Sequence, residues 1–286
     1  MNTKLIKLTD NIYYSEADHS IDQPIIAAIV GANKTLMIDA GVSREYALSF
    51  RDAVKHITGR DIDYVVLTHW HWDHVFGFSS LEMGSFGQMN IAAHLNRMKG
   101  YTWEDEALYE RVRSGEEIEF CAGNIQKVYG ENRDISIKLP EIYFDNRLDI
   151  DLGGITCELH HIPTDHTDDM TAVFVKERKV LFLSDALGPQ FYADKPYYKS
   201  KTVKKLMEVI KSFDAEWFVV SHDCPRRLEE FLENTEILEA TAMLILDGVN
   251  DKHRLIDRLR QMMGDRLLND DEEVVQLFLN GDQASV

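Results

Sequence analysis

Cysteine is scarce and scattered in this sequence. The 286-residue chain contains Cys121, Cys157 and Cys224, an odd number of widely separated thiols. Such a set predicts reduced cysteines rather than a disulfide framework, as is usual inside cells. The opening residues 1–7 also lack an apolar core of signal-peptide length. Together, the two absences predict a cytoplasmic protein.

Long apolar runs are absent as well. Apolar residues make up 44% of the chain, yet the longest apolar candidate, Pro24 to Ala32, falls far short of the roughly 20 residues that a membrane span requires. We therefore expect a soluble protein with no membrane partner. The length is sufficient for a large buried core, and we expect one large domain with an appendage.

Positive charge is in short supply. Lys and Arg number 31 against 49 Asp and Glu, so the formal net charge is −18. Binding to a phosphate backbone relies on clustered Lys and Arg, and this balance would repel nucleic acid. We expect an acidic, well-solvated surface, no nucleic-acid partner and a small-molecule substrate.

One short stretch is dense in metal-binding side chains. The β-branched run Tyr64–Leu67 is too short for a helix and predicts a buried strand, so the residues after it lie where the chain turns. Along extended backbone two histidines spaced by two point the same way, while the turn directs later ligands toward a second metal. Imidazole and carboxylate suit zinc, iron or manganese. The ligands in question are His69, His71, Asp73 and His74.

The segment His69-Trp70-His71-Trp72-Asp73-His74 resembles the HxHxDH signature of the metallo-β-lactamase superfamily. The resemblance implies an α/β fold, a four-layer αββα sandwich that holds one or two metal ions between two sheets. The family also carries a DxG after its fourth strand, and Asp39 and Gly41 match it. We predict that Asp39 supports the metal ligands without binding the metal.

Three later positions match the remaining family motifs. His166 keeps the His-Thr core of GHTPGS, although Asp165 replaces the Gly and Asp168-Asp169-Met170 replaces the rest, which leaves the loop shape open and could add carboxylates that orient an imidazole. Asp185 matches the carboxylate that bridges two metals. His222 stands in Ser-His-Asp where the family prefers Gly-His-Gly. The resemblance implies one metal on His69, His71 and His166, and a second on Asp73, His74 and His222, bridged by Asp185.

The chain before and after the first motif shows a repeated unit. Short strands are predicted at 5–8, 12–15, 25–30 and 35–38, followed by a helix from a Ser43 cap to about Ile57 with Tyr46, Phe50, Val54 and Ile57 on one face. The strand–helix–strand unit at 34–69 is echoed at 179–222. Two related halves are therefore predicted to face one another, with ligands from both meeting between them.

Two helical regions are predicted outside this repeat. An insertion at about 95–132 has helix-like segments at 104–112 and 117–128, and its aromatics Trp103, Tyr109, Phe120 and Tyr129 either line a substrate mouth or pack onto the body; packing is favoured. Helices at 227–246, 252–263 and 271–279 form a C-terminal extension that acts as a cap or a homodimer contact. We predict a metallo-β-lactamase-like domain at 1–225 and the extension at 226–286.

Other reactive residues fit no motif. His160 and His161 alternate on a predicted strand at 155–162, so both cannot bind the metals. Cys224 is expected to be buried. The remaining histidines are interpreted as structural: His19, His56, His94 and His253.

The predicted chemistry is hydrolysis. Two metals about 3.5–4 Å apart can share a water, lower its pKa to about 7 and present hydroxide to an ester, lactone, thioester or phosphodiester. Asp73 is predicted to hold the proton of that hydroxide and later release it. We expect two divalent metal ions, zinc first, with iron or manganese as alternatives. A Cys in place of Asp185 would resemble the antibiotic-hydrolysing zinc enzymes, and the lactonase Tyr expected three residues later is Gly188, leaving Tyr192, Tyr197 and Tyr198 as substitutes.

A redox enzyme is the alternative. The segment 181–190 resembles the diiron domain of flavodiiron proteins, which implies a non-haem diiron oxidoreductase, and a mononuclear iron enzyme such as a sulfur dioxygenase would use similar ligands. However, His71 stands where flavodiiron proteins tend to carry Glu, and no room for a flavodoxin follows His222. A metal-binding protein without turnover is the third alternative.

Overall fold

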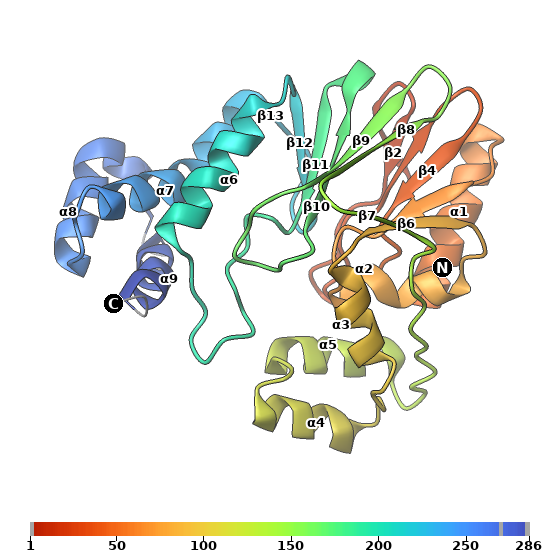
Figure 1. Cartoon of the computed structure of the whole chain (residues 1–286), viewed down its shortest axis with the longest axis horizontal. Coiled ribbons are helices and arrows are strands. Elements are labelled where there is room, and N and C mark those ends of the chain that lie inside the picture. Colours follow the sequence, from red (N-terminus) through yellow and green to blue (C-terminus); the bar gives the residue numbers. More distant parts are fainter. Residues whose placement is uncertain (1–2, 269–270, 284–286) are drawn as a thin grey trace.

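The computed structural model describes residues 3–268 and 271–283. Two sheets face each other, with α1 on the outer side of the first sheet and α6 and α7 on the outer side of the second (Figure 1). The first sheet has seven strands in the order β1-β2-β3-β4-β5-β6-β7, and the second has six in the order β13-β12-β11-β10-β9-β8. This arrangement confirms the predicted four-layer α/β sandwich.

The strands at 6–9, 12–14, 27–30, 35–38, 64–66, 156–161, 180–184 and 217–220 follow the predicted runs closely, and the other strands were not predicted. The first sheet contains β1 (Ile6–Thr9), β2 (Ile12–Tyr14), β3 (Ala27–Val30), β4 (Thr35–Ile38), β5 (Tyr64–Val66), β6 (Gly84–Gln88) and β7 (Ile142–Phe144). The second contains β8 (Arg147–Asp151), β9 (Thr156–His161), β10 (Thr171–Val175), β11 (Val180–Ser184), β12 (Trp217–Val220) and β13 (Arg226–Arg227). The apolar inner faces of the two sheets share one core cluster, which includes Ile29 and Leu36 from the first sheet and Val173 and Phe182 from the second.

The described residues form nine α-helices. They are α1 (Arg44–Thr58), α2 (Trp72–Val75), α3 (Ile91–Met98), α4 (Asp105–Ser114), α5 (Glu119–Tyr129), α6 (Ser200–Ser212), α7 (Leu228–Leu246), α8 (Lys252–Met263) and α9 (Asp271–Gln283). Short 3-10 turns are η1 (Phe76–Ser80), η2 (Lys176–Arg178) and η3 (Gly264–Arg266). No helix in the described ranges combines the length and apolar character that crossing a membrane requires.

Helix α1 begins where its sequence predicted. The Ser43 side chain accepts a hydrogen bond from the Tyr46 N–H, which satisfies a backbone donor of the first turn. Phe50 and Val54 are buried as expected, but Ile57 is 52% exposed. Ile57 therefore does not belong to the buried face, because at the last turn the helix has run past the edge of the core.

The predicted internal repeat is present. β4 and β5 are parallel and joined through α1, and β11 and β12 are parallel and joined through α6. At the end of β4, Asp39 has φ 59°, and at the end of β11, Ser184 has φ 50°. A left-handed backbone is costly for residues other than glycine and collects at functional sites. The two halves thus turn in the same strained way at the same edge of the sandwich.

The insertion forms a compact helical group. α3, α4 and α5 lie together at one end of the sandwich (Figure 1), and Trp103 and Tyr129 pack into the cluster beneath α1 and α2. Two other aromatics of the insertion remain outside the core: Tyr109 is 52% exposed and Phe120 is 60% exposed. The packing interpretation is therefore right for the first pair and wrong for the second.

Of the C-terminal helices, α7 packs against the second sheet. Phe231 of α7 stacks on Phe218 of β12, with ring centroids 4.2 Å apart, and Phe278 of α9 contacts Tyr198 at 5.1 Å. α8 has its own small apolar cluster with α7 and α9. The domain boundary after residue 225 stays a prediction, as does a homodimer through these helices.

Candidate metal centre

The first motif lies directly after β5. The chain leaves this strand at Val66 and enters α2 at Trp72, so His69 and His71 precede the helix and Asp73 and His74 lie within it. All four side chains are buried. The predicted strand, turn and change of direction are all present.

The later motif residues converge on the same place. His166 lies between β9 and β10, Asp185 directly follows β11, and His222 follows β12. Because β11 and β12 are parallel, their carboxyl ends meet at one edge. Two groups of potential metal ligands result, each with atoms within 4.8 Å of one another. They are His69, His71, His166 and Asp185, and Asp73, His74, Asp185 and His222.

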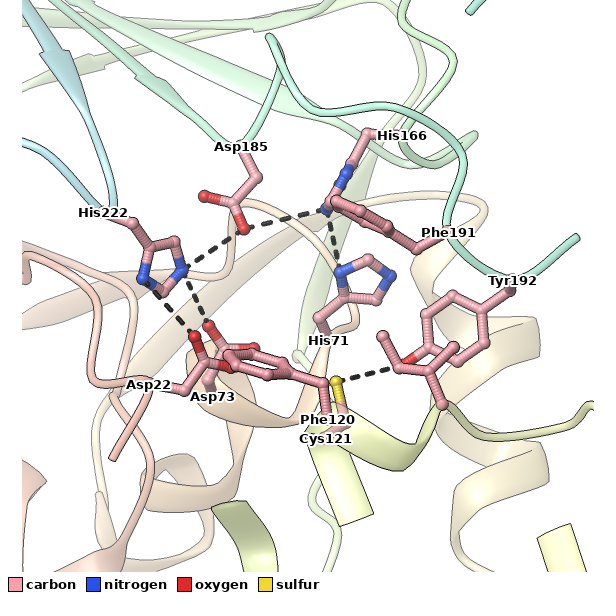
Figure 2. Close-up of a pocket in the computed structure, with 11 residues that line it drawn as sticks. Asp22, His71, Asp73, Phe120, Cys121, His166, Asp185, Phe191, Tyr192 and His222 are labelled. Carbon is pink, nitrogen blue, oxygen red and sulfur yellow. Dashed lines mark hydrogen bonds and ion pairs between the residues drawn. The ribbon is translucent and has the colours of Figure 1, made fainter. Parts of the chain in front are cut away.

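Asp185 lies between the two groups. Its Oδ2 is 3.7 Å from His69 Nε2 and 3.7 Å from His166 Nε2 in the first group. The same oxygen is 3.3 Å from His74 Nε2 and 3.6 Å from His222 Nε2 in the second. Figure 2 shows this carboxylate between His166 on one side and His222 on the other. Asp185 is therefore shared by both groups.

The first group has the properties of a metal site. His71 Nδ1 and His166 Nε2 face each other at 2.9 Å, and His69 Nε2 is buried without a hydrogen-bond partner. Burial lowers the pKa of all three imidazoles. Neutral, inward-facing ring nitrogens are the form that binds a divalent metal. These residues fit such an ion.

The second group is rich in charge. Asp73 Oδ2 is 3.1 Å from His74 Nε2 and 3.2 Å from His222 Nε2. Burial alone would lower the pKa of His222, but Asp185 and Asp73 raise it to about 10. Burial likewise opposes protonation of His74, and Asp73 and Asp39 raise its pKa above the ordinary value. The carboxylates that favour positive charge on these rings would equally favour a divalent cation.

Asp39 orients a histidine from each group. Its Oδ2 accepts from His74 Nδ1 at 2.8 Å and from the Thr68 hydroxyl at 2.8 Å, while Oδ1 accepts from the Thr68 N–H at 2.7 Å. The Thr68 hydroxyl is in turn 3.2 Å from His69 Nδ1. With both Nδ1 atoms occupied in this way, both Nε2 atoms are directed at Asp185. The strained backbone of Asp39 places one carboxylate where it supports a histidine of each ligand group.

His166 is held by the chain after Asp185. Its Nδ1 donates to the Pro189 carbonyl at 3.1 Å. A Cβ atom at Gly188 would lie 2.6 Å from the same Nδ1, so no larger residue fits without displacing the ring. A tyrosine at this position, as the resemblance to lactonases implied, would therefore require the His166 ring to move. Of the three alternative tyrosines, Tyr192 lines the cavity beside the metal-binding groups.

The two unusual carboxylates after His166 do not contact that ring. Asp168 pairs with His94 at 2.7 Å, and His94 stacks on Trp70 with ring planes 9° apart. Asp169 accepts from the Thr167 hydroxyl, which accepts from Trp70 Nε1 at 2.9 Å. Both carboxylates therefore fix Trp70, whose ring lies 4.6 Å from His71. His94, which has no motif, acts here as part of that support.

Sequence reasoning missed one carboxylate and misplaced one thiol. Asp22, in the loop between β2 and β3, lies 3.7 Å from His222 Nδ1 and adopts φ 57°; no motif surrounds it, so only the tertiary structure reveals it. Cys224 is exposed rather than buried, because the chain after β12 turns outward. His160 and His161 stay outside both groups as predicted, bonding Glu158 and the Asp168 carbonyl.

A family model for the metallo-beta-lactamase superfamily matches residues 25–222, which include every motif residue described above. The chain belongs to the metallo-beta-lactamase superfamily. The prediction of a superfamily member with a His/Asp metal site is confirmed at that level. The weaker resemblance to flavodiiron proteins finds no support.

Known members of the superfamily resemble this chain to different extents. A metallo-beta-lactamase fold-containing protein of Sulfurisphaera tokodaii is 29% identical over 177 residues, which are 60% of this chain and 60% of the relative. The chain thus matches less than two thirds of that relative's length.

Solved structures share the fold. The inverting sec-alkylsulfatase Pisa1 from Pseudomonas sp. matches 99% of this chain and 51% of its own, with 13% identity and a TM-score of 0.65. The metallo-beta-lactamase FIM-1 from Pseudomonas aeruginosa, in its mono-zinc form, matches 85% of this chain and 97% of its own, with 14% identity and a TM-score of 0.57. At such identities the likeness concerns the fold alone.

Proposed function

We propose that this protein is a dinuclear metal-dependent hydrolase that cleaves an ester, lactone, thioester or phosphodiester bond. The observation that carries the proposal is the position of Asp185, whose Oδ2 is within 3.7 Å of imidazole nitrogens from both ligand groups. A carboxylate shared in this way is suited to bridging two cations. Membership of the superfamily supports the same reading.

The ligand assignment follows the two groups. His69, His71 and His166 would hold one metal, and Asp73, His74 and His222 the other, with Asp185 between them. Bound divalent ions would supply a hydroxide nucleophile near neutral pH and polarise the oxygen of the scissile group. Zinc is our first choice because imidazole and carboxylate suit it, and iron or manganese would accept the same donors.

Asp73 is the residue we propose for proton transfer. It lies in the cavity wall with Asp185 and His222. Burial would raise the pKa of Asp73, but His74 and His222 lower it below the ordinary value, so the carboxylate is ionised and would hold a proton only weakly before passing it on. In the reaction the oxygen of the nucleophile bonds to the carbonyl or phosphoryl centre, the bond to the leaving oxygen or sulfur breaks, and the proton held at Asp73 passes to the leaving group.

Asp39 and Thr68 would act as positioning residues. Both are buried beneath the ligand groups and hold ring nitrogens rather than facing the cavity. Their contribution is to keep Nε2 of His69 and His74 aligned before substrate arrives, so that the two rings do not have to reorient during the reaction. We further propose that the protein acts in the cytoplasm on a small molecule.

The deciding experiment is a substrate panel run on protein loaded with zinc, manganese or iron. Aryl esters, lactones, thioesters, bis-aryl phosphodiesters and an alkyl sulfate are compared, beside an oxygen electrode with thiol donors and added flavodoxin. We expect hydrolysis of at least one carbonyl or phosphoryl ester and no oxygen uptake. Iron-dependent oxygen uptake without any hydrolysis would overturn the proposal and establish the redox alternative.

A further inference from the structure

The metal-binding groups face a cavity of about 390 Å³ with two unlike walls. The ligand wall consists of Asp22, His71, Asp73, His166, Asp185 and His222. The aromatic wall consists of Ile118, Phe120 and Cys121 from the insertion, with Phe191 and Tyr192 from the loop after β11. Figure 2 shows Phe120, Phe191 and Tyr192 around the space beside His71 and Asp185.

Two rings of the aromatic wall are open to solvent. Phe120 is 60% exposed and Phe191 is 40% exposed, while Phe191 also lies edge-on to His166 with centroids 6.0 Å apart. Large apolar side chains grouped at a cavity mouth, on a chain of formal charge −18, are costly to leave in water unless they meet an apolar ligand. Because Phe191 lies next to His166, an apolar group bound there would lie beside the bond that is cleaved.

Tyr192 and Cys121 hold the base of the aromatic wall in place. The Tyr192 hydroxyl donates to Glu117 Oε1 at 3.0 Å and lies 3.9 Å from Cys121 Sγ, which ties the loop to the insertion. The Tyr192 ring lies 5.3 Å from both Trp70 and His71. Cys121 also belongs to the core cluster beneath the insertion. The cavity therefore exists before substrate binds.

The charges around the cavity favour an uncharged ligand. None of the described residues that line it is Lys or Arg. Two divalent cations would be largely offset by Asp22, Asp73, Asp185 and a hydroxide, so little positive charge would remain for an anionic group. Selection must then come from apolar contact.

From this arrangement we infer that the substrate is an uncharged ester or thioester carrying an apolar aryl or alkyl group, which packs between Phe120 and Phe191. The inference rests on the proposed hydrolase function and narrows it. It also separates this chain from an enzyme for alkyl sulfates or other anions, although one structural neighbour acts on a sulfate ester. Phe120 and Phe191 would be specificity-determining residues.

A chain-length series tests the inference by turnover. 4-Nitrophenyl acetate, butyrate and hexanoate share one leaving group, and each added methylene contributes apolar burial. We expect kcat/KM to rise about tenfold from acetate to hexanoate in the wild type and less than twofold in Phe120→Ala and Phe191→Ala. Tyr109→Ala is the matched control, because Tyr109 is a similarly exposed aromatic of the same insertion that does not line the cavity. A flat series in the wild type would overturn the inference.

A binding experiment tests the inference without turnover. 2-Naphthol is titrated into metal-loaded protein and followed by fluorescence anisotropy, with 2-naphthalenesulfonate as the charged counterpart. We expect naphthol to bind at least fivefold more weakly to Phe120→Ala than to the wild type or Tyr109→Ala, and the sulfonate to bind at least fivefold more weakly than naphthol. Equal binding of the two probes, or no effect of Phe120→Ala, would overturn the inference even if esters are hydrolysed. Naphthol binding as expected without hydrolysis of any ester would instead reject the proposed hydrolase.

Discussion

The ligand wall and the aromatic wall of the cavity are held by different forces. In the ligand wall, His166 is buried, donates from Nδ1 to the Pro189 carbonyl at 3.1 Å and faces His71 Nδ1 at 2.9 Å. In the same wall, Asp73 Oδ2 lies 3.2 Å from His222 Nε2. Phe120 and Phe191 instead project from an inserted helix and a loop, which the Tyr192 hydroxyl joins through a hydrogen bond to Glu117. A change on the ligand wall therefore disturbs several groups at once, whereas a change on the aromatic wall should remain local.

The largest effect is expected for Asp185→Ala. This substitution removes the one oxygen shared by both ligand groups, so the second metal should be lost and turnover should fall at least ~100-fold, beyond the usual cost of losing a supporting residue. Metal content by elemental analysis and kcat are measured together. His160→Ala is the control, since His160 bonds Glu158 outside both groups. Equal losses in the two variants would show that the later motifs are misassigned.

Asp39→Asn should come next. An amide in place of one carboxylate oxygen brings an N–H donor against the donors His74 Nδ1, Thr68 Oγ1 or the Thr68 N–H, which disturbs ring orientation in both groups. Metal affinity should drop roughly 10–100-fold, measured by competition with a chelator. Asp149→Asn, which alters only a surface pair with Arg147, should bind metal like the wild type. Unchanged affinity in Asp39→Asn would mean that Asp39 is only a turn residue.

Gly188→Ala tests whether the lack of a side chain at residue 188 is needed to make room for the His166 ring. The new Cβ would lie 2.6 Å from His166 Nδ1, so the ring must shift and activity should fall roughly tenfold, by analogy with the loss of a residue that orients a ligand. Gly123→Ala, in α5, meets nothing within 4 Å and should instead stabilise the helix by about 0.5–1 kcal/mol. Activity, metal content and thermal unfolding are measured for both variants. Full activity in Gly188→Ala would remove the close-contact explanation.

Tyr192→Phe should have the smallest effect. It keeps the ring beside His71 but removes the hydrogen bond to Glu117, a cost of about 1–3 kcal/mol in stability because Glu117 is buried. Metal content should be unchanged and KM should rise only a few-fold. Titration with zinc and steady-state kinetics check both points. A loss of metal would show that the two walls are coupled, and that changes on the aromatic wall do not remain local.

Much of the candidate metal centre could be predicted from the sequence because its candidate ligands lie in short, ordered segments. The strand before His69, the Ser43 cap and the strand ending before His222 depend on neighbours a few residues away. The same local logic predicted α8 at Lys252–Met263 without error. It failed for Ile57, since exposure at a helix end depends on where the core stops.

The carboxylate Asp22, the support of Trp70 by Asp168 and Asp169, and the aromatic wall could not be predicted in this way. Each depends on segments that are distant in the chain, as Tyr192 and Glu117 are, and a pattern of neighbouring residues carries no record of which distant loops meet. The sequence by itself determined the types and order of the candidate ligands and the two related halves, because residue chemistry and strand periodicity are local properties, while the four-layer sandwich followed from the resemblance to the family. Only the tertiary structure decided that Asp185 lies between both groups and that exposed aromatic rings border the cavity, because packing of the two sheets and of the insertion sets those distances.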